Sequence, residues 1–229
     1  MKIDLYDDGI GFVEYVQHMG DDLTIVNAAR VSFGKQKTEI DEKDHKLIKY
    51  LIKHKHTSTL EHNVMTFRFK VPLFVRSQHH RHRTWSYNEI SRRYTSYDLQ
   101  FYEPKTFRSQ HKSNRQASNL DNINPVIYPD LSDVEFGVCA DAVVQKHHKK
   151  CLTLFNTLIS RGVCREQARG VLPQNMYTEY YGTCNLNNMI KFIKLRDHEG
   201  AQGEIQEVAK AIKEIAAAHW PVAFKHLEA

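Results

Sequence analysis

Hydrophobic residues recur with a helical period in several stretches of the chain. Residues 41–55 carry Leu47, Ile48, Leu51 and Ile52, two adjacent pairs four positions apart, with acidic side chains early and basic ones late. An acidic start and a basic end both suit the dipole of a helix. We therefore expect an amphipathic helix in this stretch that ends near His54.

The hydrophobic residues of a later stretch recur with a period of two. In residues 63–71, Met65, Phe67 and Phe69 alternate with other side chains, which puts the three on one face of an extended chain. This alternation predicts a half-buried strand. Pro72 suits the first turn of a helix, and we expect that helix to continue to about residue 83.

The remaining segments complete an α+β pattern. We expect an exposed loop of variable order over residues 105–130, and helices over residues 134–161, 165–171, 187–195 and 204–217. Gly162 closes the longest of these helices, and Asn185 caps the third. Residues 176–183 are aromatic and β-prone. The order of elements predicts a single domain over residues 1–229, with a mainly antiparallel sheet that helices cover on one face.

Composition limits the class of protein. The chain has 229 residues, 41% of them hydrophobic and 26% charged, as in an ordinary globular protein. No apolar run comes near the roughly 18 residues that a membrane span needs. The first residues, MKIDLYDDG, are acidic where a signal peptide is basic, so we expect a cytoplasmic protein without membrane contact. The net charge of +5 favours anionic partners, but it does not distinguish a nucleotide from a nucleic acid.

The cysteines do not indicate a metal or redox site. Cys139, Cys151, Cys164 and Cys184 are widely spaced and form no C-x-x-C pair. We interpret them as buried free thiols.

Residues 81–94 contain four arginines, one histidine, one acid and two serines, but no glycine. Planar guanidinium groups at this density suit the binding of oxyanions. Residues 35–136 contain no glycine, which excludes a P-loop and a glycine-rich dinucleotide turn here, so side chains must hold any nucleotide. The alternative is a basic nucleic-acid-binding protein, in which Trp85, Tyr87 and Tyr94 would stack on bases.

Histidines are frequent nearby, but their spacing does not fit a metal site. No H-E-x-x-H is present, and Glu61 has no second acid close to it in the sequence. We expect no metal, and the alternative, a metal-dependent hydrolase, would lose its activity to chelators. The histidines considered are His54, His56, His62, His79, His80 and His82.

The spacing of the arginines carries a resemblance to a known family. Residues 81–83, Arg-His-Arg, are followed by seven residues and then by Ser91, Arg92 and Arg93. This pattern resembles the signature of the flavin-dependent thymidylate synthases, and shorter matches extend the resemblance over about residues 28–206. It implies an enzyme that makes dTMP from dUMP, with 5,10-methylenetetrahydrofolate as carbon donor and NADPH, through bound FAD, as reductant. It also implies small-molecule partners and no nucleic acid. The family needs no cysteine, which agrees with four scattered thiols.

The resemblance assigns roles to individual residues. Arg196 is implied to contact the pyrimidine, where a permanently charged guanidinium can stabilise developing negative charge. From the residues alone, the alternative is a cation favoured by a helix end. Arg169 is implied to bind the dUMP phosphate. The implied substrate-binding residues are Gln78, Arg81, Glu89, Ser91, Arg92, Arg93, Arg169 and Arg196. The implied cofactor-binding residues are Ser32, His56, Ser58, Glu61, Arg81, His82, Arg83, Glu89, Asn185, Asn187 and Lys191.

Two of these residues depart from the family pattern. Family members often have arginine where this chain has Asn187, and asparagine where it has Lys191. On a helix the two positions share a face, so Lys191 can replace the lost cation. Ser91 is implied to position the substrate, and a nucleophilic serine with His82 as its base is the alternative. Family members are homotetramers with active sites shared between chains, which implies the same assembly here.

Overall fold

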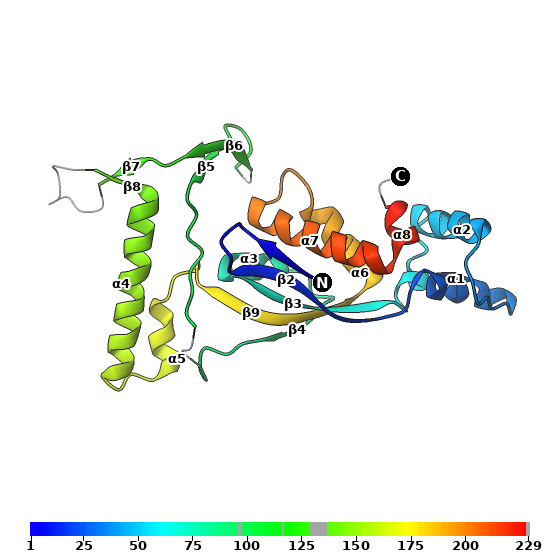
Figure 1. The fold of residues 1–229 in the computed structure, drawn as a ribbon, viewed down its shortest axis with the longest axis horizontal. Coiled ribbons are helices and arrows are strands. Elements are labelled where there is room, and N and C mark those ends of the chain that lie inside the picture. The colour runs from blue at the N-terminus through cyan, green and yellow to red at the C-terminus, as the bar shows by residue number, and fades with distance from the viewer. Residues whose placement is uncertain (96–97, 116, 129–136, 228–229) are drawn as a thin grey trace. The chain divides into compact units, whose positions relative to one another are not determined.

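The computed structural model describes residues 1–95, 98–115, 117–128 and 137–227 (Figure 1). The chain divides into two compact units. Unit 1 consists of Met1–Lys70, Gln78–Glu89 and Glu179–Ala229, and unit 2 consists of Val71–Ser77 and Ile90–Thr178. Whether both fold together as one domain, as expected from the sequence, stays a prediction.

Unit 1 is built on a five-stranded sheet with the strand order β1-β2-β3-β9-β4. β1 pairs antiparallel with β2, β2 with β3, and β4 with β9. The predicted strand after residue 63 is therefore confirmed, and so are the β-prone residues 176–183. The strands are β1 (Lys2–Leu5), β2 (Gly11–Met19), β3 (Val64–Pro72), β4 (Ser86–Glu89) and β9 (Tyr177–Asn185).

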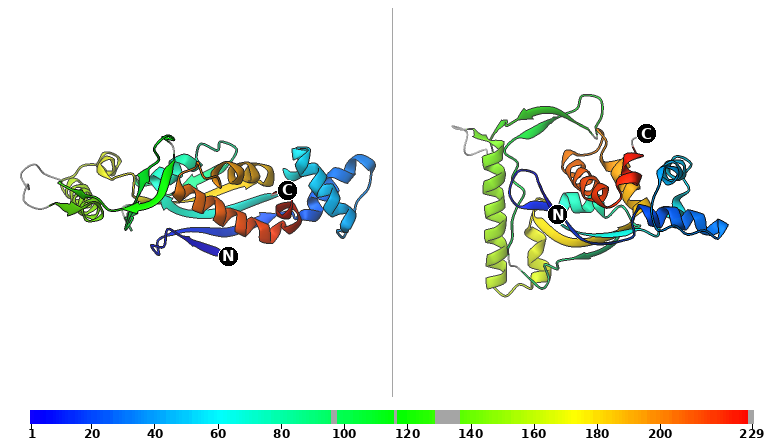
Figure 2. Two further views of the ribbon diagram at one scale, coloured as in Figure 1. Left: turned by 90° about the horizontal axis from the view of Figure 1, so that it is seen from above. Right: turned by 45° about the vertical axis from the view of Figure 1, so that its right-hand side comes forward.

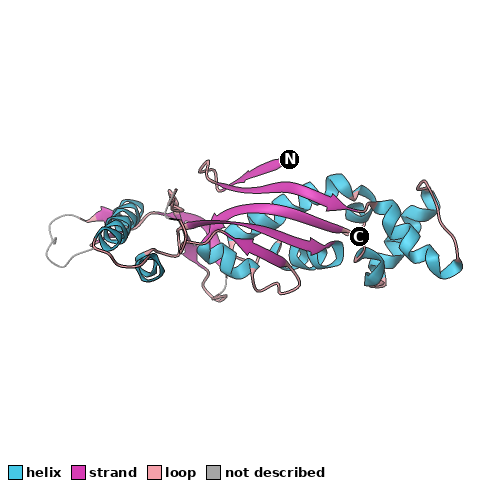
Figure 3. Ribbon diagram, turned by 90° about the horizontal axis from the view of Figure 1, so that it is seen from below, coloured by secondary structure: helices cyan, strands magenta, loops and turns pink. Residues whose placement is uncertain are grey.

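Helices of unit 1 cover one face of this sheet, as the sequence predicted. In Figure 3 the strands lie toward the viewer, with α6 (Leu186–Arg196) and α7 (Gly203–His219) behind them. The ends of both helices lie within about two residues of the predicted ends. The views in Figure 2 show α1 (Asp22–Arg30) and α2 (Glu42–Lys53) side by side, and both also contact α8 (Pro221–Lys225). Two 3₁₀ turns complete the unit: η1 (Val31–Phe33) and η2 (Thr57–Leu60).

The core of unit 1 lies between the sheet and these helices. Phe67 and Phe69 project from β3 into it and are completely buried, as the alternating pattern required. On the neighbouring β9, a Cβ atom at Gly182 would lie 2.8 Å from a ring carbon of Phe69. The glycine therefore lets the Phe69 ring approach the β9 backbone closely.

Polar side chains fix the ends of the helices. Asp41 caps α2 by accepting from the backbone N–H groups of Lys43 and Asp44, and Asn185 caps α6 by accepting from Asn188. Both helices were predicted, and the cap at Asn185 is confirmed. The buried Asn63 accepts the indole N–H of Trp220 at 2.9 Å, which ties the C-terminal segment to the start of β3.

Unit 2 contains the long helix α4, the short helix α5 and two small hairpins. Phe155 of α4 is 1% exposed and belongs to the core of this unit. The short helix predicted over residues 165–171 is confirmed as a helix with a 3₁₀ continuation. The elements are α3 (Leu73–His79), β5 (Phe107–Gln110), β6 (Ser118–Ile123), β7 (Val126–Ile127), β8 (Val138–Cys139), α4 (Ala140–Ser160), α5 (Arg165–Ala168) and η3 (Arg169–Val171). α3 continues into unit 1 at its last two residues.

Three predicted segments differ from the structure. The expected loop over residues 105–130 contains strands, because backbone pairing in an exposed hairpin needs no apolar side chains. The expected helix over residues 134–161 begins only at Ala140, after Val138–Cys139 pairs with Val126–Ile127. Residues 116, 129–130 and 134–136 of these predictions lie outside the described residues. The third difference is that α3 ends at His79 and does not reach residue 83.

Within the described part of the chain, no helix combines the length and the hydropathy needed to cross a membrane.

Candidate active site

The turn after α3 presents the first group of candidate residues. The N–H of His82 donates to the carbonyl of His79 at 2.9 Å, and the N–H of Arg81 donates to the carbonyl of Gln78 at 3.3 Å. The hydroxyl of Tyr87 donates to the carbonyls of His79 and His82, at 2.9 and 3.1 Å. These contacts satisfy the carbonyls that the end of a helix leaves unpaired, which explains why α3 ends early.

His79 holds this turn from the inside. Its side chain is fully buried, and its Nδ1 lies 2.9 Å from the hydroxyl of Tyr180. Burial, followed by the nearby His82, His80 and Arg196, lowers the pKa of His79 well below its ordinary value. His79 is therefore a neutral histidine packed within the fold.

Arg196, the last residue of α6, contacts this turn. Its Nε donates to Nε2 of His82 at 3.1 Å, and its Nη2 donates to the backbone carbonyl of Gln78 at 3.4 Å. Because arginine only donates, His82 must be neutral with its proton on Nδ1. Burial and then the Arg196 charge lower the pKa of His82 to about 4. Such a histidine is a weak base at neutral pH, which does not favour its use to activate Ser91.

The flanking arginines are available to ligands. Arg81 and Arg83 are exposed, and within the described residues their side chains form no hydrogen bond or ion pair. Glu89 is exposed at the end of β4, where it pairs across from Tyr180 in β9. The sequence predicted this cluster of cations, and the structure brings Gln78, His82 and Arg196 into contact.

A second group lies at the other end of α6. Asn187 is 5% exposed, and its amide donates to the carboxylate of Glu61 at 2.8 Å. Lys191 follows one turn later and is exposed, as expected for a cation on the same helix face. The contact between Glu61 and Asn187 connects η2 to the start of α6, close to the cap residue Asn185.

Exposed rings adjoin the η2 turn. Ser58 is exposed within η2, and His56 is exposed just before it. The ring of Tyr50 lies 4.2 Å from that of His54 and 5.7 Å from that of His56. Tyr50 is 52% exposed, so this group of rings lies at the surface.

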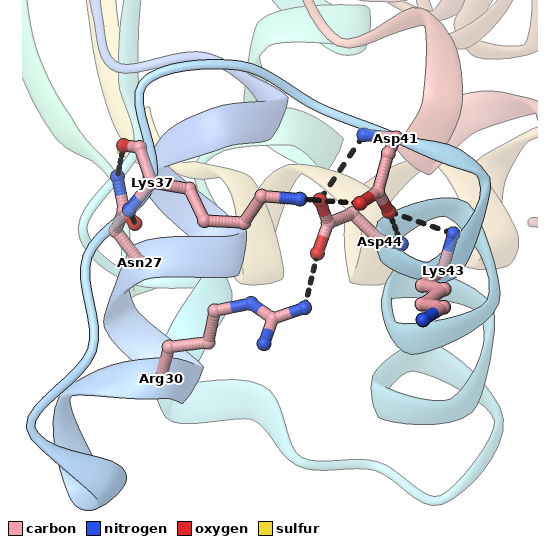
Figure 4. Close-up of polar contacts among 6 residues, drawn as sticks. All are labelled: Asn27, Arg30, Lys37, Asp41, Lys43 and Asp44. Atoms are coloured by element: carbon pink, nitrogen blue, oxygen red, sulfur yellow. Dashed lines mark hydrogen bonds and ion pairs between the residues drawn. The ribbon is translucent and has the colours of Figure 1, made fainter.

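Ser32 lies in η1, on a segment held by a cluster of charges (Figure 4). The side chain of Asp44 is completely buried and forms ion pairs with Arg30, at 2.5 Å, and with Lys37. Asn27 binds the backbone of Lys37 in both directions, at 2.8 and 3.0 Å. The segment of residues 31–36 is thus fixed at both ends, while its side chains, including Phe33 at 79%, are exposed.

The remaining candidates belong to unit 2. Arg92 Nη2 donates to the backbone carbonyl of Tyr177 at 3.4 Å, and Arg93 forms an exposed ion pair with Glu166 at 3.7 Å. The Ser91 hydroxyl accepts the N–H of Arg93 at 3.3 Å. Arg169 begins η3 and is exposed, and its side chain has no partner among the described residues.

The thiols only partly match the sequence prediction. Cys184 is buried, and burial raises its pKa well above the ordinary value, so it is a poor nucleophile. Cys139 and Cys164 are exposed and Cys151 is half-buried, so the expectation of buried thiols was wrong for these three. Cys139 lies in a short hairpin strand, and Cys164 is the N-cap residue of α5. In the described residues no three His, Cys, Asp or Glu side chains are grouped so as to hold a metal ion.

Two residues next to the site were not found from the sequence. Gln78 donates to Gln202, and Gln202 donates to Glu204 at 2.8 Å. Gln202 stands 124 positions after Gln78, so no local periodicity relates them. Only a family comparison or the fold itself could have indicated this contact.

The chain is similar to proteins of a known family. The model of the family described as thymidylate synthase complementing protein matches residues 14–222. A flavin-dependent thymidylate synthase from Thermus thermophilus is 44% identical over 218 residues, covering 95% of this chain and 76% of that protein. Another from Kosmotoga olearia is 40% identical over 216 residues, covering 94% of this chain and 89% of that protein.

A solved structure has a similar fold. The UMP/dUMP methylase PolB from Streptomyces cacaoi, bound with 5-Br dUMP, superposes with a TM-score of 0.82 at 29% sequence identity. The superposition covers 99% of this chain and 97% of that one.

Proposed function

The chain belongs to the flavin-dependent thymidylate synthase family, and on this premise we propose that it makes dTMP from dUMP by reductive methylation. In this proposal 5,10-methylenetetrahydrofolate donates the carbon, NADPH is the reductant and FAD is the cofactor. The observation that best supports it is the contact of Arg196 with neutral His82 and with Gln78, beside two arginines without protein partners in the described residues. A cytoplasmic location stays a prediction.

The residues present fit an anionic, flat cofactor. Arg81 and Arg83 offer guanidinium groups to a diphosphate, and the exposed rings near His56 suit stacking on an isoalloxazine. Ser32, Ser58 and Lys191 are exposed and offer further polar contacts. When bound, FAD would carry the reducing equivalents between NADPH and the one-carbon unit.

Not every implied cofactor residue is equally open. Asn187 and Glu61 bind each other, and Asn185 caps α6. We propose that these three shape the cofactor site by fixing η2 against α6, and that Lys191 supplies the cation. His82 and Glu89 complete the proposed set.

Arg196 is the proposed electrostatic catalyst. Its Nε donates to a neutral acceptor, and within the described residues no acid forms an ion pair with it. That charge can stabilise an oxygen or N3 of the pyrimidine as electrons accumulate there. Gln78 lies beside it as a binding residue. Because burial lowers the pKa of Arg196, the guanidinium is held in surroundings where a developing anion gains more than in water.

The unit 2 residues Ser91, Arg92, Arg93 and Arg169 are proposed to bind the phosphate of dUMP. Arg169 is the strongest candidate because its side chain is exposed and has no partner in the described residues. A phosphate accepts the bidentate hydrogen bonds that a guanidinium offers. Ser91 is proposed as a positioning hydroxyl.

We also propose a homotetramer whose active sites take residues from more than one chain. The family resemblance supports this assembly. Sedimentation equilibrium of the FAD-loaded protein tests it, and a monomer at micromolar concentration would contradict it.

The reaction is tested by release of tritium from dUMP labelled at C5, because methylation must replace that hydrogen. FAD, NADPH and methylenetetrahydrofolate are supplied, and omission of each in turn is the control. Tritium release that depends on all of them is the expected result. Colourless protein without release, whose DNA affinity falls steeply with salt, would support a nucleic-acid-binding protein instead.

A further inference from the structure

A row of three hydrogen-bonded polar side chains runs from Gln78 to α7, all within unit 1. Gln78 Nε2 donates to Gln202 Oε1, and Gln202 Nε2 donates to Glu204 Oε2 at 2.8 Å. Glu204 is 6% exposed. Gln202 is the N-cap residue of α7 and Glu204 lies in its first turn, so both are held by a long helix whose other face is in the core.

This row of hydrogen bonds ends on the buried carboxylate of Glu204, which accepts from Gln202. Gln202 turns its NH₂ group toward Glu204 and its carbonyl oxygen toward Gln78. Gln78 must then use its own NH₂ group on Gln202. Its Oε1 remains as an acceptor, and no described residue donates to it. The amide of Gln78 is therefore oriented before any ligand binds.

The neighbour of Gln78 offers the opposite polarity. Arg196 donates to the backbone carbonyl of Gln78 at 3.4 Å, so its guanidinium lies beside this residue. A guanidinium offers only donors, whereas Oε1 of Gln78 offers an acceptor. The imide edge of uracil has carbonyl oxygens on either side of an N3–H donor, and it matches this pair. Cytosine has an unprotonated N3 and an amino group, so it does not.

We propose that Gln202 and Glu204 are positioning residues that hold Oε1 of Gln78 toward the N3–H of dUMP and so determine the preference for uracil over cytosine. This inference rests on the proposed function, in which Gln78 and Arg196 bind dUMP. It adds two residues whose only effect on the substrate passes through the orientation of one amide.

The test is a comparison of Kd values for dUMP and dCMP, measured by titration calorimetry on the FAD-loaded full chain. Glu204→Gln replaces one carboxylate oxygen by NH₂. Residue 204 can then donate as well as accept, so it no longer fixes the direction of the hydrogen bonds to Gln202 and Gln78. The amide of Gln78 can then turn over and meet either base. We expect the preference for dUMP over dCMP to fall about 10-fold, the usual effect of one hydrogen bond with an unsatisfied partner.

A matched control lies one turn further along α7. Glu207 accepts the backbone N–H of Tyr6 at 2.8 Å and does not contact Gln202. Glu207→Gln makes the same chemical change on the same helix, and it should leave the preference unchanged. Gln202→Leu removes the link between Gln78 and Glu204 while keeping the Glu204 side chain, and it should reproduce the effect of Glu204→Gln if the latter variant does not fold.

A second analogue identifies the donor on the substrate. The deoxyribose 3′-hydroxyl is the other donor of dUMP, and 2′,3′-dideoxyuridine monophosphate lacks it. If Gln78 accepts from N3–H, Glu204→Gln should weaken this analogue and dUMP by the same factor. A weakening confined to dUMP would overturn the N3–H assignment in favour of the 3′-hydroxyl.

The proposed function and the positioning role of Gln202 and Glu204 can be contradicted separately. Wild-type protein that does not bind dUMP would contradict the proposed function itself. Wild-type protein that prefers dUMP, together with folded Glu204→Gln and Gln202→Leu variants that keep the full preference, would overturn the positioning role alone.

Discussion

Two clusters of cations in unit 1 use their charges in opposite ways. Arg30 and Lys37 both form ion pairs with the completely buried carboxylate of Asp44. Arg81 and Arg83 are exposed, and their side chains have no partner among the described residues. The same residue types thus form a closed structural cluster in one place and an open binding surface in the other, which a count of charges along the sequence does not reveal.

The two clusters differ because the cations of the closed one share a buried acid, Asp44. Burial alone would raise the pKa of Asp44, but hydrogen bonds from Lys37 and Arg30 outweigh it and lower the pKa. Burying a carboxylate is energetically costly unless its cationic partners remain in contact with it. The closed cluster fixes the segment that carries Ser32, whereas the open one keeps its charge for a ligand. Disruption of the closed cluster should lower the stability of the fold. Disruption of the open cluster should weaken ligand binding or lower turnover.

The largest effect is expected for Asp44→Ala. It leaves Arg30 and Lys37 without their shared anion and should lower the free energy of unfolding by about 3 kcal/mol, the lower end for a buried pair because both cations can reach water. Urea denaturation at pH 7 measures it. Glu42→Ala removes an exposed carboxylate of the same helix and should change stability little.

The pH dependence of this difference has a definite sign. The lowered pKa of Asp44 means that its contribution is present above the ordinary pKa of 3.8 and is lost as the pH falls toward the folded value. The gap between wild type and Asp44→Ala should therefore shrink below about pH 4. A gap that grows in acid would contradict the assignment of the charge to Asp44.

The fold was predictable where a side-chain period exists. α2, β3, α6 and α7 follow from apolar residues repeated every 3.6 or 2 positions, together with caps such as Asn185. β4 was hidden because its four residues stand inside the arginine-rich segment. β5 and β6 were missed because they are exposed, and Ser, Asn and Gln dominate their sequence. The early end of α3 depends on Tyr87 of β4, whose hydroxyl donates to the carbonyl of His79, the last residue of the helix.

A smaller but functional effect is expected for Arg196→Ala. If Arg196 stabilises charge that develops on the pyrimidine, turnover should fall about 100-fold or more, the usual loss for one preorganised donor. Reduction of FAD by NADPH should survive, since the pyrimidine takes no part in it. Arg196→Lys should rescue only in part, because an ammonium lacks the planar fork. Unlike Asp44→Ala, the variant should keep its stability, and near-normal dTMP formation would return Arg196 to a helix-end cation.

Arg169→Ala should affect binding rather than turnover. The Kd for dUMP should rise about 10-fold to 100-fold, the usual value of a charged hydrogen bond, with little change in flavin content. Arg165→Ala is the matched control, an exposed arginine one turn earlier in α5. Equal affinities in wild type and Arg169→Ala would remove the residue from the phosphate site.

The site itself was predictable only in part. The spacing of Arg81, His82 and Arg83 before Ser91 pointed to a nucleotide, and the family resemblance supplied the roles. The contact between His82 and Arg196 spans 114 positions, and no periodicity encodes it. The consequence, a histidine kept neutral beside an arginine, depends on burial and distance and so needed the fold.

The smallest effect concerns that histidine, and it tests whether the charge of Arg196 helps to keep His82 neutral. Burial first and Arg196 second hold the pKa of His82 at about 4, below its ordinary 6.5. Arg196→Met removes the charge but keeps much of the burial, so the pKa should rise above 4 and stay below 6.5. Nitrogen–proton NMR of the imidazole measures it, with Arg83→Met as the exposed control.

The effect of His82 on stability has the opposite sign to that of a histidine paired with an acid. Because the unfolded chain takes up the proton first, His82 costs stability as the pH falls from 6.5 toward 4, and the variant should lose less over this range. An unchanged pKa in Arg196→Met would mean that burial alone keeps His82 neutral and that Arg196 is free to serve the ligand without holding this acceptor.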